Sequence, residues 1–513
     1  MPNRNKQLAA SLTVLHQLQT AGRHVFQSKD LSRVHRQRLL QSGFIQLVMK
    51  GWLISSSPAA RDGDSTPWYA SFWEFCAQYC EARFGDQWYL APEESLLLHA
   101  ENTVIPNQVT ICSPKGTNNK TDLLFGTSIY DLKQPEMPPS AELIQRHGLR
   151  FLTHPAALVR ISGDFYARNP IETRVALTNV RDESEVLRHL LDGGHSVIAG
   201  RLAGAFRTIG RPNIADEITV TMKAAGHVVR ETDPFTKDQL RGNISANEAP
   251  IVGRMRAMWS SMREQVIETF PTPPAAITDS EKYLRSVDEI YRSDAYHSLS
   301  IEGYRVSPEL IAQVESGNWN PDHNGEHKQS RDALAARGYW QAFQVVKSSV
   351  AKILAGANAG ALLKSAHREW YRELFQPCVM AGLVPPSALA GYRNNAVYLR
   401  TSRYVPPRWE AVRDAMPALF DLLENEPEAS VRAVLGHWMF GYIHPYPDGN
   451  GRIARFLMNA MLASGGYPWT VIRVDERVPY LTALDRASID LQIAPFAAFI
   501  GERVGRAEQA FTV

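Results

Sequence analysis

Apolar residues recur every three or four positions in two segments near the C-terminus, which is the spacing of one face of an α-helix. The first segment contains Val431, Val434, Leu435, Trp438, Met439 and Tyr442, and the second contains Ile453, Phe456, Leu457, Ala460 and Met461. The chain across the junction reads HPYPDGNGRIARF over residues 444–456. Because Pro445 and Pro447 end the first helix, the pattern predicts two helices joined by a short glycine-rich loop.

The same periodicity predicts further helices over residues 280–303, 331–350, 361–375 and 408–424. Residues 390–407 differ, because short strand-like pieces flank Asn394 and Asn395, a pair that favours a turn. We therefore expect a β-hairpin there, inside an otherwise helical domain over residues 280–510.

The N-terminal residues 1–58 show a different order of elements. Helical spacing covers residues 8–18, either Ser28 or Asp30 is placed to cap a short helix, and a further helix is expected over residues 32–41. Two short strands then surround the turn at Lys50 and Gly51. Three helices followed by a hairpin are typical of a winged helix-turn-helix.

The region between these two domains is expected to be α+β over residues 59–235. It contains an aromatic-rich helix over 68–85, strands within 107–116 and 121–132, and two helices over 183–210 divided by Gly193 and Gly194. Residues 236–279 are expected to form a helical linker that ends in a proline-rich break. The predicted fold class is therefore multidomain, with a winged helix and an α+β domain before a helical domain that carries a hairpin.

Charge changes this picture only at the N-terminus. The 513 residues have a formal net charge of +2, which excludes a protein that coats nucleic acid through its overall charge. Residues 1–55, however, hold eight Lys and Arg residues against Asp30 alone. Three of these cations lie on the helix that would enter a DNA groove, namely Arg33, Arg36 and Arg38.

Cysteines and hydrophobic runs indicate the compartment. The four cysteines form no metal-binding pair and are expected to be buried and reduced. The first residues lack the apolar core of a signal peptide, and no run of about 20 apolar residues is long enough for a membrane span. We therefore expect a cytoplasmic protein.

The loop at residues 444–452 carries the chemistry. Gly449, Asn450 and Gly451 form a turn whose successive N–H groups make an anion-binding nest, and the following helix begins at the same place. Arg452 and Arg455 lie on one face of its first turn. Cations are unfavourable at a helix N-terminus, so this pattern predicts a bound polyphosphate.

Two neighbours complete the predicted site. Asp448 would repel phosphate unless a cation lies between them, and Mg²⁺ is bound in this way by one carboxylate and substrate phosphates. His444 has the ordinary pKa range of a residue that accepts a proton from an attacking hydroxyl. A metal hydrolase built on His444 and Asp448 is disfavoured, because no further His or Glu ligands follow at helical spacing.

The stretch HPYPDGNGRIAR resembles the signature of the Fic (Fido) family, and the similarity extends over about 280–505. The resemblance implies transfer of AMP from ATP to a Ser, Thr or Tyr hydroxyl of a protein. It implies His444 as general base, Asp448 as the Mg²⁺ ligand, and nucleotide binding by Gly449, Asn450, Gly451, Arg452, Arg455 and, in the adenine pocket, Tyr480.

The same resemblance has three further implications. Residues 392–404 match the flap that aligns a target segment by strand addition. Tyr446 replaces the usual Phe, with little expected effect, and Gly451 argues against the kinase variant that carries Lys there. A bacterial protein and a homodimer are also consistent with the family.

Residues 298–303, SLSIEG, are similar to the family's inhibitory motif, with Ser298, Glu302 and Gly303 at its defining positions. We expect Glu302 to form a bidentate pair with Arg455 and so to block the γ-phosphate contact. Some relatives with this glutamate also remove AMP, and the sequence leaves the balance between transfer and removal open.

Residues 24–54, HVFQSKDLSRVHRQRLLQSGFIQLVMKGWLI, and residues 89–111, YLAPEESLLLHAENTVIPNQVTI, resemble AbiEi-type antitoxin and regulator proteins over roughly the first 230 residues. This resemblance implies a regulatory rather than a catalytic module, with DNA binding as one role. Two alternatives to AMP transfer follow. One is a DNA-binding regulator whose Fic domain is sensory or weakly active, and the other is a Fic transferase that uses another donor, such as UMP or phosphocholine.

Overall fold

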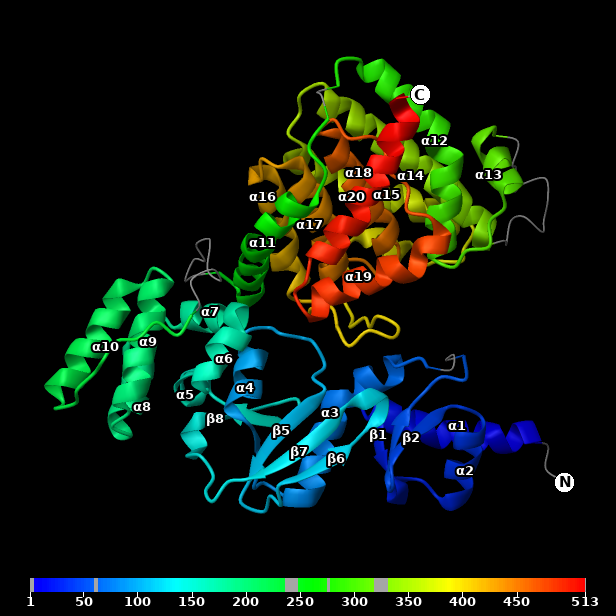
Figure 1. Cartoon of the computed structure of the whole chain (residues 1–513). Helices are drawn as coiled ribbons and strands as arrows, with labels where there is room; N and C mark the ends of the chain where they lie inside the picture. Colours follow the sequence, from blue (N-terminus) through cyan, green and yellow to red (C-terminus); the bar gives the residue numbers. More distant parts are fainter. Residues whose placement is uncertain (1–3, 60–62, 236–247, 275–276, 318–330, 513) are drawn as a thin grey trace. The chain divides into compact units, whose positions relative to one another are not determined.

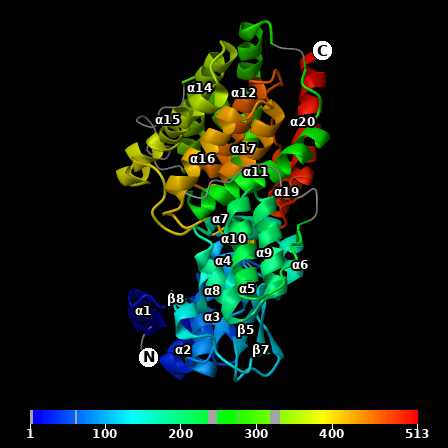
Figure 2. The same ribbon diagram turned by 90° about the vertical axis from the view of Figure 1, so that its left-hand side faces the viewer.

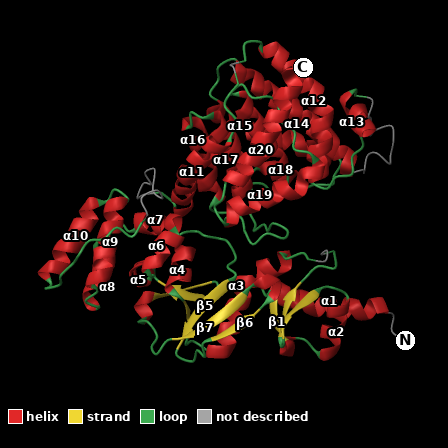
Figure 3. Cartoon of the chain, viewed as in Figure 1, coloured by secondary structure: helices red, strands yellow, loops and turns green. Residues whose placement is uncertain are grey.

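The computed structural model describes residues 4–59, 63–235, 248–274, 277–317 and 331–512 (Figure 1). The chain divides into two compact units. The first comprises Met1–Pro250 together with Tyr398–Val405, and the second comprises Ile251–Val397 with Pro406–Val513. The first unit contains both sheets and the second is helical (Figure 3).

The first 58 residues form the predicted series of helices and a hairpin. The elements are α1 (Arg4–Thr20), β1 (Val25–Gln27), η1 (Ser28–Asp30), α2 (Arg33–Gln41), β2 (Ile45–Met49) and β3 (Trp52–Ser55). The strands form an antiparallel sheet in the order β1-β3-β2. Ser32 caps α2 by accepting the His35 N–H at 3.3 Å. Strand β1 was not expected, because three residues carry too little pattern to be recognised.

The second sheet has six strands in the order β6-β7-β5-β4-β9-β8. They are β4 (Tyr89–Leu90), β5 (Gln108–Ser113), β6 (Asn119–Asp122), β7 (Ser128–Lys133), β8 (Leu143–Arg146) and β9 (Leu149–Leu152). The pairs β5–β7 and β4–β9 are parallel and the other pairs are antiparallel. Short 3₁₀ turns η2 (Leu124–Gly126) and η3 (Ser140–Glu142) precede β7 and β8.

Helix α3 (Thr66–Phe84) joins the two sheets into one core, as its aromatic residues predict. Trp68, Phe72 and Phe75 are fully buried in a cluster that also contains Trp52 of the small sheet and Ile111 of the large one. The predicted ranges 1–58 and 59–235 therefore share apolar contacts within a single unit.

The remaining helices of this unit form a second apolar cluster. They are α4 (Pro92–His99), α5 (His154–Arg160), α6 (Gly163–Arg168), α7 (Pro170–Asn179), α8 (Ser184–Asp192), α9 (Ser196–Thr208) and α10 (Pro212–Ala224). Gly194, with φ +60°, separates α8 from α9 as expected. The four cysteines of the chain are free and buried.

The second unit begins with α11 (Pro250–Thr269), within the range expected to be a linker. Trp259 and Arg263 donate to the Glu426 carboxylate at 3.0–3.2 Å, and Arg254 donates to the Tyr442 hydroxyl at 3.0 Å. Side-chain hydrogen bonds therefore attach α11 to the rest of this unit. Residues 236–247 of the predicted linker lie outside the described residues.

The helices that follow surround the candidate site. They are α12 (Ser280–Ile301), α13 (Pro308–Glu315), α14 (Arg331–Leu354), α15 (Ala359–Met380), η5 (Pro386–Ala390), α16 (Val412–Asn425), α17 (Ala429–Ile443), α18 (Asn450–Ala463), η6 (Val474–Glu476), α19 (Arg477–Ile489) and α20 (Ala494–Thr512).

Helices α14 to α17 each pack against the next (Figure 2), and α18 packs against α14, α15 and α17. Nearly every residue of α17 and α18 is buried, which is typical of helices at the centre of a helical domain. No helix among the described residues is both long and apolar enough to cross a bilayer.

The predicted β-hairpin over residues 390–407 is wrong, because this segment contains no strand. Its backbone groups bond elsewhere. The Arg393 N–H donates to the Pro445 carbonyl at 2.8 Å, and the Arg403 carbonyl accepts from the Ile105 N–H at 2.8 Å. Tertiary partners therefore replace the cross-strand bonds that the turn signal predicted.

Candidate active site

The loop between α17 and α18 starts with His444 in a left-handed conformation, with φ +51° and ψ +58°. Its N–H donates to the Phe440 carbonyl at 3.0 Å and ends the helix. Left-handed conformations of residues other than glycine are uncommon and cluster at functional sites. The local backbone therefore points to a role for the His444 side chain beyond ending α17.

The His444 side chain is held in its neutral form. Burial lowers its pKa to about 4, and Arg393 contributes in the same direction, while a hydrogen bond to the Gly441 backbone and the carboxylates of Glu302 and Asp448 oppose the shift. Neutral imidazole is the form that accepts a proton. Near neutral pH, His444 is therefore available as a general base.

The start of α18 has the predicted nest. Gly449 adopts φ +83°, and the first helical hydrogen bond joins the Ile453 N–H to the Gly449 carbonyl at 3.1 Å. Within the described part of the chain, the N–H groups of Asn450, Gly451 and Arg452 form no hydrogen bond. A Cβ on Gly449 would lie 2.8 Å from the Phe375 ring, so this turn requires glycine.

The Asn450 side chain holds the loop in shape. Its carbonyl oxygen accepts from the Tyr446 N–H at 2.9 Å, and its amide donates to the Tyr446 carbonyl at 2.8 Å. Both ends of this side chain are therefore engaged with the loop. A contribution of Asn450 to nucleotide binding would come from its backbone N–H.

Arg452 is a buried cation with unused donors. Its guanidinium lies between the rings of Tyr304 and Phe375, 5.2 and 5.1 Å from their centroids. The Nε and Nη2 atoms have no hydrogen-bond partner among the described residues, although Nη2 lies 3.5 Å from Asp448 Oδ1. Burial of a cation without full hydrogen bonding is costly, which favours an anionic ligand at this place.

The Asp448 carboxylate fits a magnesium ion that is shared with a substrate. Its side chain is 52% exposed, and its Oδ1 accepts from the Gly449 N–H at 2.6 Å. No cluster of three or more His, Cys, Asp or Glu side chains capable of holding a metal occurs in the described residues. A cation here would therefore take its remaining ligands from phosphate and water.

Arg455 is joined to the inhibitory motif as expected, with one correction. Its Nη2 donates to Glu302 Oε1 at 2.7 Å, while Nε donates to the Ser298 hydroxyl at 2.9 Å and Nη2 to the Ser298 carbonyl at 3.1 Å. The predicted bidentate pair is wrong, because a single bond joins Arg455 to Glu302 while its Nε is bonded to Ser298. Arg455 is therefore bonded to two residues of the motif, of which Glu302 was the predicted partner.

The charges of this pair reinforce each other. Burial raises the pKa of Glu302, but Arg455 and Arg452 outweigh this effect and hold it below its usual range. Burial likewise lowers the pKa of Arg455, and Glu302 more than offsets it. Both groups are therefore charged near neutral pH.

Glu302 lies directly over the nest. An ideal Cβ on Gly451 would be 2.3 Å from Glu302 Oε1, so the absence of a side chain at Gly451 makes room for this carboxylate. Its oxygen therefore occupies space beside the free N–H groups where an anion would bind. Ser298, Glu302 and Arg455 thus come together at the start of α18.

The end of α12 fixes the Glu302 backbone. Gly303 has φ +89° and its N–H donates to the Ser300 carbonyl at 3.0 Å, while the Tyr304 N–H donates to the Leu299 carbonyl at 3.1 Å. These two bonds define a Schellman motif. The Arg477 side chain donates to the Ile301 carbonyl at 2.8 Å, so α19 also caps α12.

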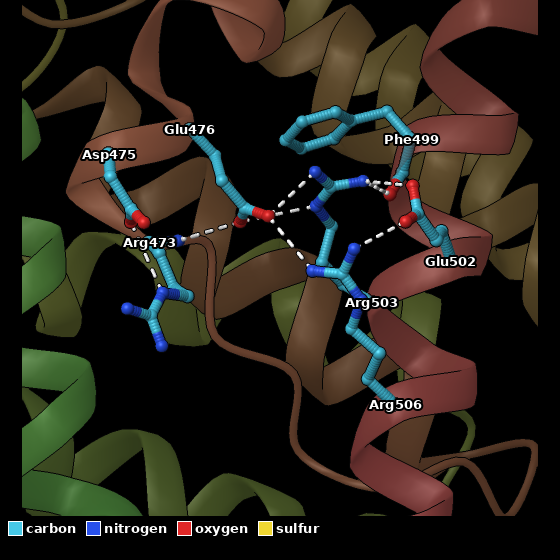
Figure 4. Close-up of polar contacts among 7 residues, drawn as sticks. All are labelled: Arg473, Asp475, Glu476, Phe499, Glu502, Arg503 and Arg506. Carbon is cyan, nitrogen blue, oxygen red and sulfur yellow. Dashed lines mark hydrogen bonds and ion pairs between the residues drawn. The ribbon is translucent and has the colours of Figure 1, made fainter.

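An ion-pair network joins η6 to α20, next to the start of α19 (Figure 4). Arg503 of α20 donates to Glu476 of η6 at 2.8 Å, Arg506 lies 3.1 Å from the same carboxylate, and the Arg503 guanidinium covers the Phe499 ring. Next to Glu476, the Val474 N–H donates to His297 of α12 at 3.2 Å. The network thus anchors η6 beside the helix that carries Glu302.

Tyr480, predicted to line the adenine pocket, is buried and bonds to His437 at 2.8 Å through its hydroxyl. Burial raises its pKa, and Arg455 acts in the opposite direction. Tyr480 therefore lies close to the arginine of the site, and its predicted contact with a base stays a prediction.

Sequence reasoning missed Arg393, a buried residue that ties the segment after η5 to the catalytic loop. Its side chain donates to the carbonyls of His444 at 2.8 Å and Asn395 at 2.9 Å, and to that of Pro407. The one sequence signal for Arg393 was its position within residues 392–404, which resemble the flap. Its carbonyl partner at His444 lies far away in the sequence and leaves no local pattern.

The predicted DNA-binding arginines lie on α2 in the first unit. Arg33 is exposed, whereas Arg36 donates to the Ser28 carbonyl at 2.9 Å and Arg38 to the Gln7 carbonyl at 3.5 Å. Two of the three side chains therefore brace the fold around α2. DNA binding by this face stays a prediction.

Comparison with known proteins identifies the region around the site. Residues 361–462 match the family model described as the Fic/DOC family. The protein adenylyltransferase Fic of Nematostella vectensis is 28% identical over 283 residues, which are 54% of this chain and 62% of that protein. The protein adenylyltransferase Fic of Drosophila willistoni is 28% identical over 233 residues, 44% of this chain and 43% of its own length.

Each match therefore covers less than two thirds of these relatives. Among solved structures, a fragment of Fic-1 from Caenorhabditis elegans is 20% identical with a TM-score of 0.38, covering 67% of this chain and 97% of that one. A Fic domain containing signaling protein from Bacteroides thetaiotaomicron is 19% identical with a TM-score of 0.36, covering 50% of this chain and 95% of that one.

The matched range contains His444, the nest, Arg452 and Arg455, while Glu302 and Tyr480 lie outside it. The range matched by the Fic/DOC family model includes the start of α18, where the geometry places the anion site. Residues 361–462 of this chain are thus similar to the Fic/DOC family.

Proposed function

We propose that this protein transfers AMP from ATP to a hydroxyl group of a protein, and that Glu302 inhibits the transfer. The observation that carries the proposal is the anion site at the start of α18, with free N–H groups and two buried arginines beside a neutral His444. Relatives that are 25–29% identical and named protein adenylyltransferase support the choice of reaction.

The reaction would use the residues as follows. The target hydroxyl oxygen attacks the α-phosphorus of ATP, the bond from that phosphorus to the bridging oxygen breaks, and pyrophosphate leaves. His444 takes the hydroxyl proton on its imidazole. The N–H groups at the start of α18, with Arg452 and Arg455, hold the phosphates and stabilise the charge that develops on them.

Magnesium would be held by Asp448 together with the phosphates. The half-exposed carboxylate and the lack of an all-protein metal cluster in the described residues suit an ion that arrives with its nucleotide. Such an ion supplies neutralisation of phosphate charge. The second oxygen of Asp448 is available for it, since Oδ1 is bonded to the Gly449 N–H.

Inhibition would follow from competition for Arg455. The Glu302 carboxylate accepts one of its donors and lies beside Gly451, so a γ-phosphate cannot use the same contact. ATP would then bind in a pose that is unproductive for transfer. The same residue could also serve in removal of AMP, by aligning a water molecule that attacks the modified protein. This removal is measured as loss of label from modified protein.

The test compares the wild-type protein with Glu302→Gly after incubation with an equal mixture of ATP, UTP and CDP-choline and with Mg²⁺. Self-modification is then identified by mass spectrometry. We expect AMP adducts on Glu302→Gly at about ten to a hundred times the wild-type level, since a charge-assisted hydrogen bond is lost.

His444→Ala in the Glu302→Gly background is the control and should carry no adduct. Equal modification of the wild type and Glu302→Gly would reject inhibition, and an adduct of UMP or phosphocholine would reject ATP as donor. A gel-shift of the whole protein on the DNA upstream of its own gene, at low and high salt, separately tests the DNA-binding proposal.

A further inference from the structure

The second half of the flap-like segment belongs to the N-terminal unit. Residues 398–405 group with that unit rather than with the helical one. The Ile105 N–H donates to the Arg403 carbonyl at 2.8 Å, and Arg403 Nη1 donates to the Ile105 carbonyl at 2.9 Å. The Thr103 hydroxyl donates to the Val405 carbonyl. Residues 103 and 105 thus face 405 and 403, which is an antiparallel register.

Side chains extend this attachment. Val405 packs against the apolar cluster that contains Trp52, Trp68 and Phe72. Arg400 Nε lies 3.5 Å from Asp64 Oδ2, and Asp64 is itself fixed by the Thr66 N–H at 3.0 Å. The attachment therefore combines backbone, apolar and charged contacts within one compact unit.

The attachment uses the groups that a strand here would offer to a target. The carbonyls of Arg403 and Val405 are bonded to residues 103–105, and the Tyr404 N–H donates to the Ser402 hydroxyl at 3.0 Å. Strand addition requires free N–H and C=O groups along an edge. While they are attached, residues 403 and 405 therefore do not offer these carbonyls to a target segment.

We propose that residues 103–105 restrain the flap and so limit docking of the acceptor protein, as a second restraint separate from Glu302. This proposal rests on the proposed AMP transfer. The competitor is an extended segment of the acceptor, which would pair with the backbone of residues 403–405 once they are released from residues 103–105. The N-terminal unit then acts on the choice of acceptor and leaves nucleotide binding unchanged.

The attachment is tested by limited digestion with trypsin, which cleaves after Arg403. Thr103→Val removes the hydroxyl donor and keeps the branched shape, and Asp64→Asn removes the charge facing Arg400 while its oxygen can still accept from Thr66. In the double variant we expect the initial rate of cleavage after Arg403 to rise about three- to tenfold, as one or two hydrogen bonds are lost.

Thr121→Val, on strand β6, is the matched control and should leave this cleavage rate unchanged. Unfolding scans of each variant show whether a change in cleavage comes from general loss of structure. Equal cleavage of the double variant and the wild type would overturn the proposed attachment.

The restraint is tested by transfer in the Glu302→Gly background, with the full-length His444→Ala protein as the acceptor that cannot itself transfer. Thr103→Val with Asp64→Asn should raise AMP incorporation about three- to tenfold through a lower KM for the acceptor, with the KM for ATP unchanged. Faster cleavage without faster incorporation would overturn the restraint. If Glu302→Gly incorporates no AMP at all, the proposed function itself is rejected. The digestion experiment would in that case still test the attachment of residues 403–405.

Discussion

At the scale of single residues, Tyr446 shows how the catalytic loop is anchored. Its ring stacks on Tyr371 with centroids 3.8 Å apart and planes 6° apart, and it is fully buried. Its hydroxyl has no hydrogen-bond partner within the residues that the structure describes. The ring therefore holds the loop through packing, and the hydroxyl adds the cost of an unsatisfied polar atom.

We accordingly predict that Tyr446→Phe raises the free energy of unfolding of the helical unit by about 1 kcal/mol. The matched control is Tyr442→Phe, because the Tyr442 hydroxyl accepts from Arg254 at 3.0 Å and its removal should destabilise the protein. Thermal denaturation of the three proteins measures both effects. Destabilisation by Tyr446→Phe would mean that its hydroxyl has a partner in solution.

The pKa of His444 gives a second prediction at this scale. Because the pKa is lowered to about 4, the neutral base persists as pH falls, and protonation should reduce kcat only when pH approaches that value. A pH profile of transfer by Glu302→Gly should therefore show no acid limb centred near 6.5. A midpoint at 6–7 that moves with substitutions around His444 would contradict this account of its environment.

At the scale of elements, helix α12 leads directly into Glu302, the residue proposed to inhibit transfer. The helix also carries Asp294, which is buried and accepts from the Tyr339 hydroxyl of α14 at 2.7 Å. Burial raises the pKa of Asp294 to about 6, and Tyr339 and Arg455 oppose this shift. Ionisation of Asp294 in α12 at neutral pH therefore lowers the stability of the folded protein.

The sign of the pH effect follows from this raised pKa. Between the unfolded value near 4 and the folded value near 6, the folded protein binds more protons, so stability falls as pH rises. Asp294→Asn should remove this contribution and raise the free energy of unfolding by about 1–3 kcal/mol at pH 7.5, with little change at pH 4. Denaturant titrations at the two pH values measure it, and an equal effect at both would show that Asp294 acts through packing alone.

Secondary structure could be predicted where a local pattern decided it. Helices α17 and α18 form where the apolar spacing predicted them, although nearly all of their residues are buried, and α12 ends before Gly303 as the residue type indicated. The hairpin at 390–407 failed because its backbone partners, Ile105 and Pro445, lie far away in the sequence. Local turn chemistry cannot report such partners.

The site shows the same division. The pairing of Arg455 with Glu302 was predictable from two motifs, whereas its monodentate form, with Nε bonded to Ser298, was not. The position of Arg452 between Tyr304 and Phe375 depends on α18, α15 and the segment after α12 coming together. No spacing in the sequence records that arrangement.

At the scale of the whole molecule, the chain combines a helical unit that includes the range similar to the Fic/DOC family with an N-terminal unit that contains two sheets. The part of the flap assigned to the N-terminal unit gives that unit a direct connection to the segment proposed to receive the acceptor. The two proposed restraints would act at different substrates. Glu302 would act on the nucleotide and residues 103–105 on the protein acceptor, so loss of both should increase transfer more than loss of either.

Transfer of AMP, and its inhibition by Glu302, is measured most simply by following label from ATP into protein. Wild-type protein, Glu302→Ala and Glu289→Ala, which removes an exposed acid from the same helix, are each incubated with ATP labelled at either the α- or the γ-phosphate. Of the three proteins, we expect only Glu302→Ala to be strongly labelled by ATP carrying the label at the α-phosphate. No protein should be labelled from the γ-phosphate, and adding His444→Ala to Glu302→Ala should abolish the signal. Label from the γ-phosphate, or equal α-label on all three proteins, would contradict the proposed function.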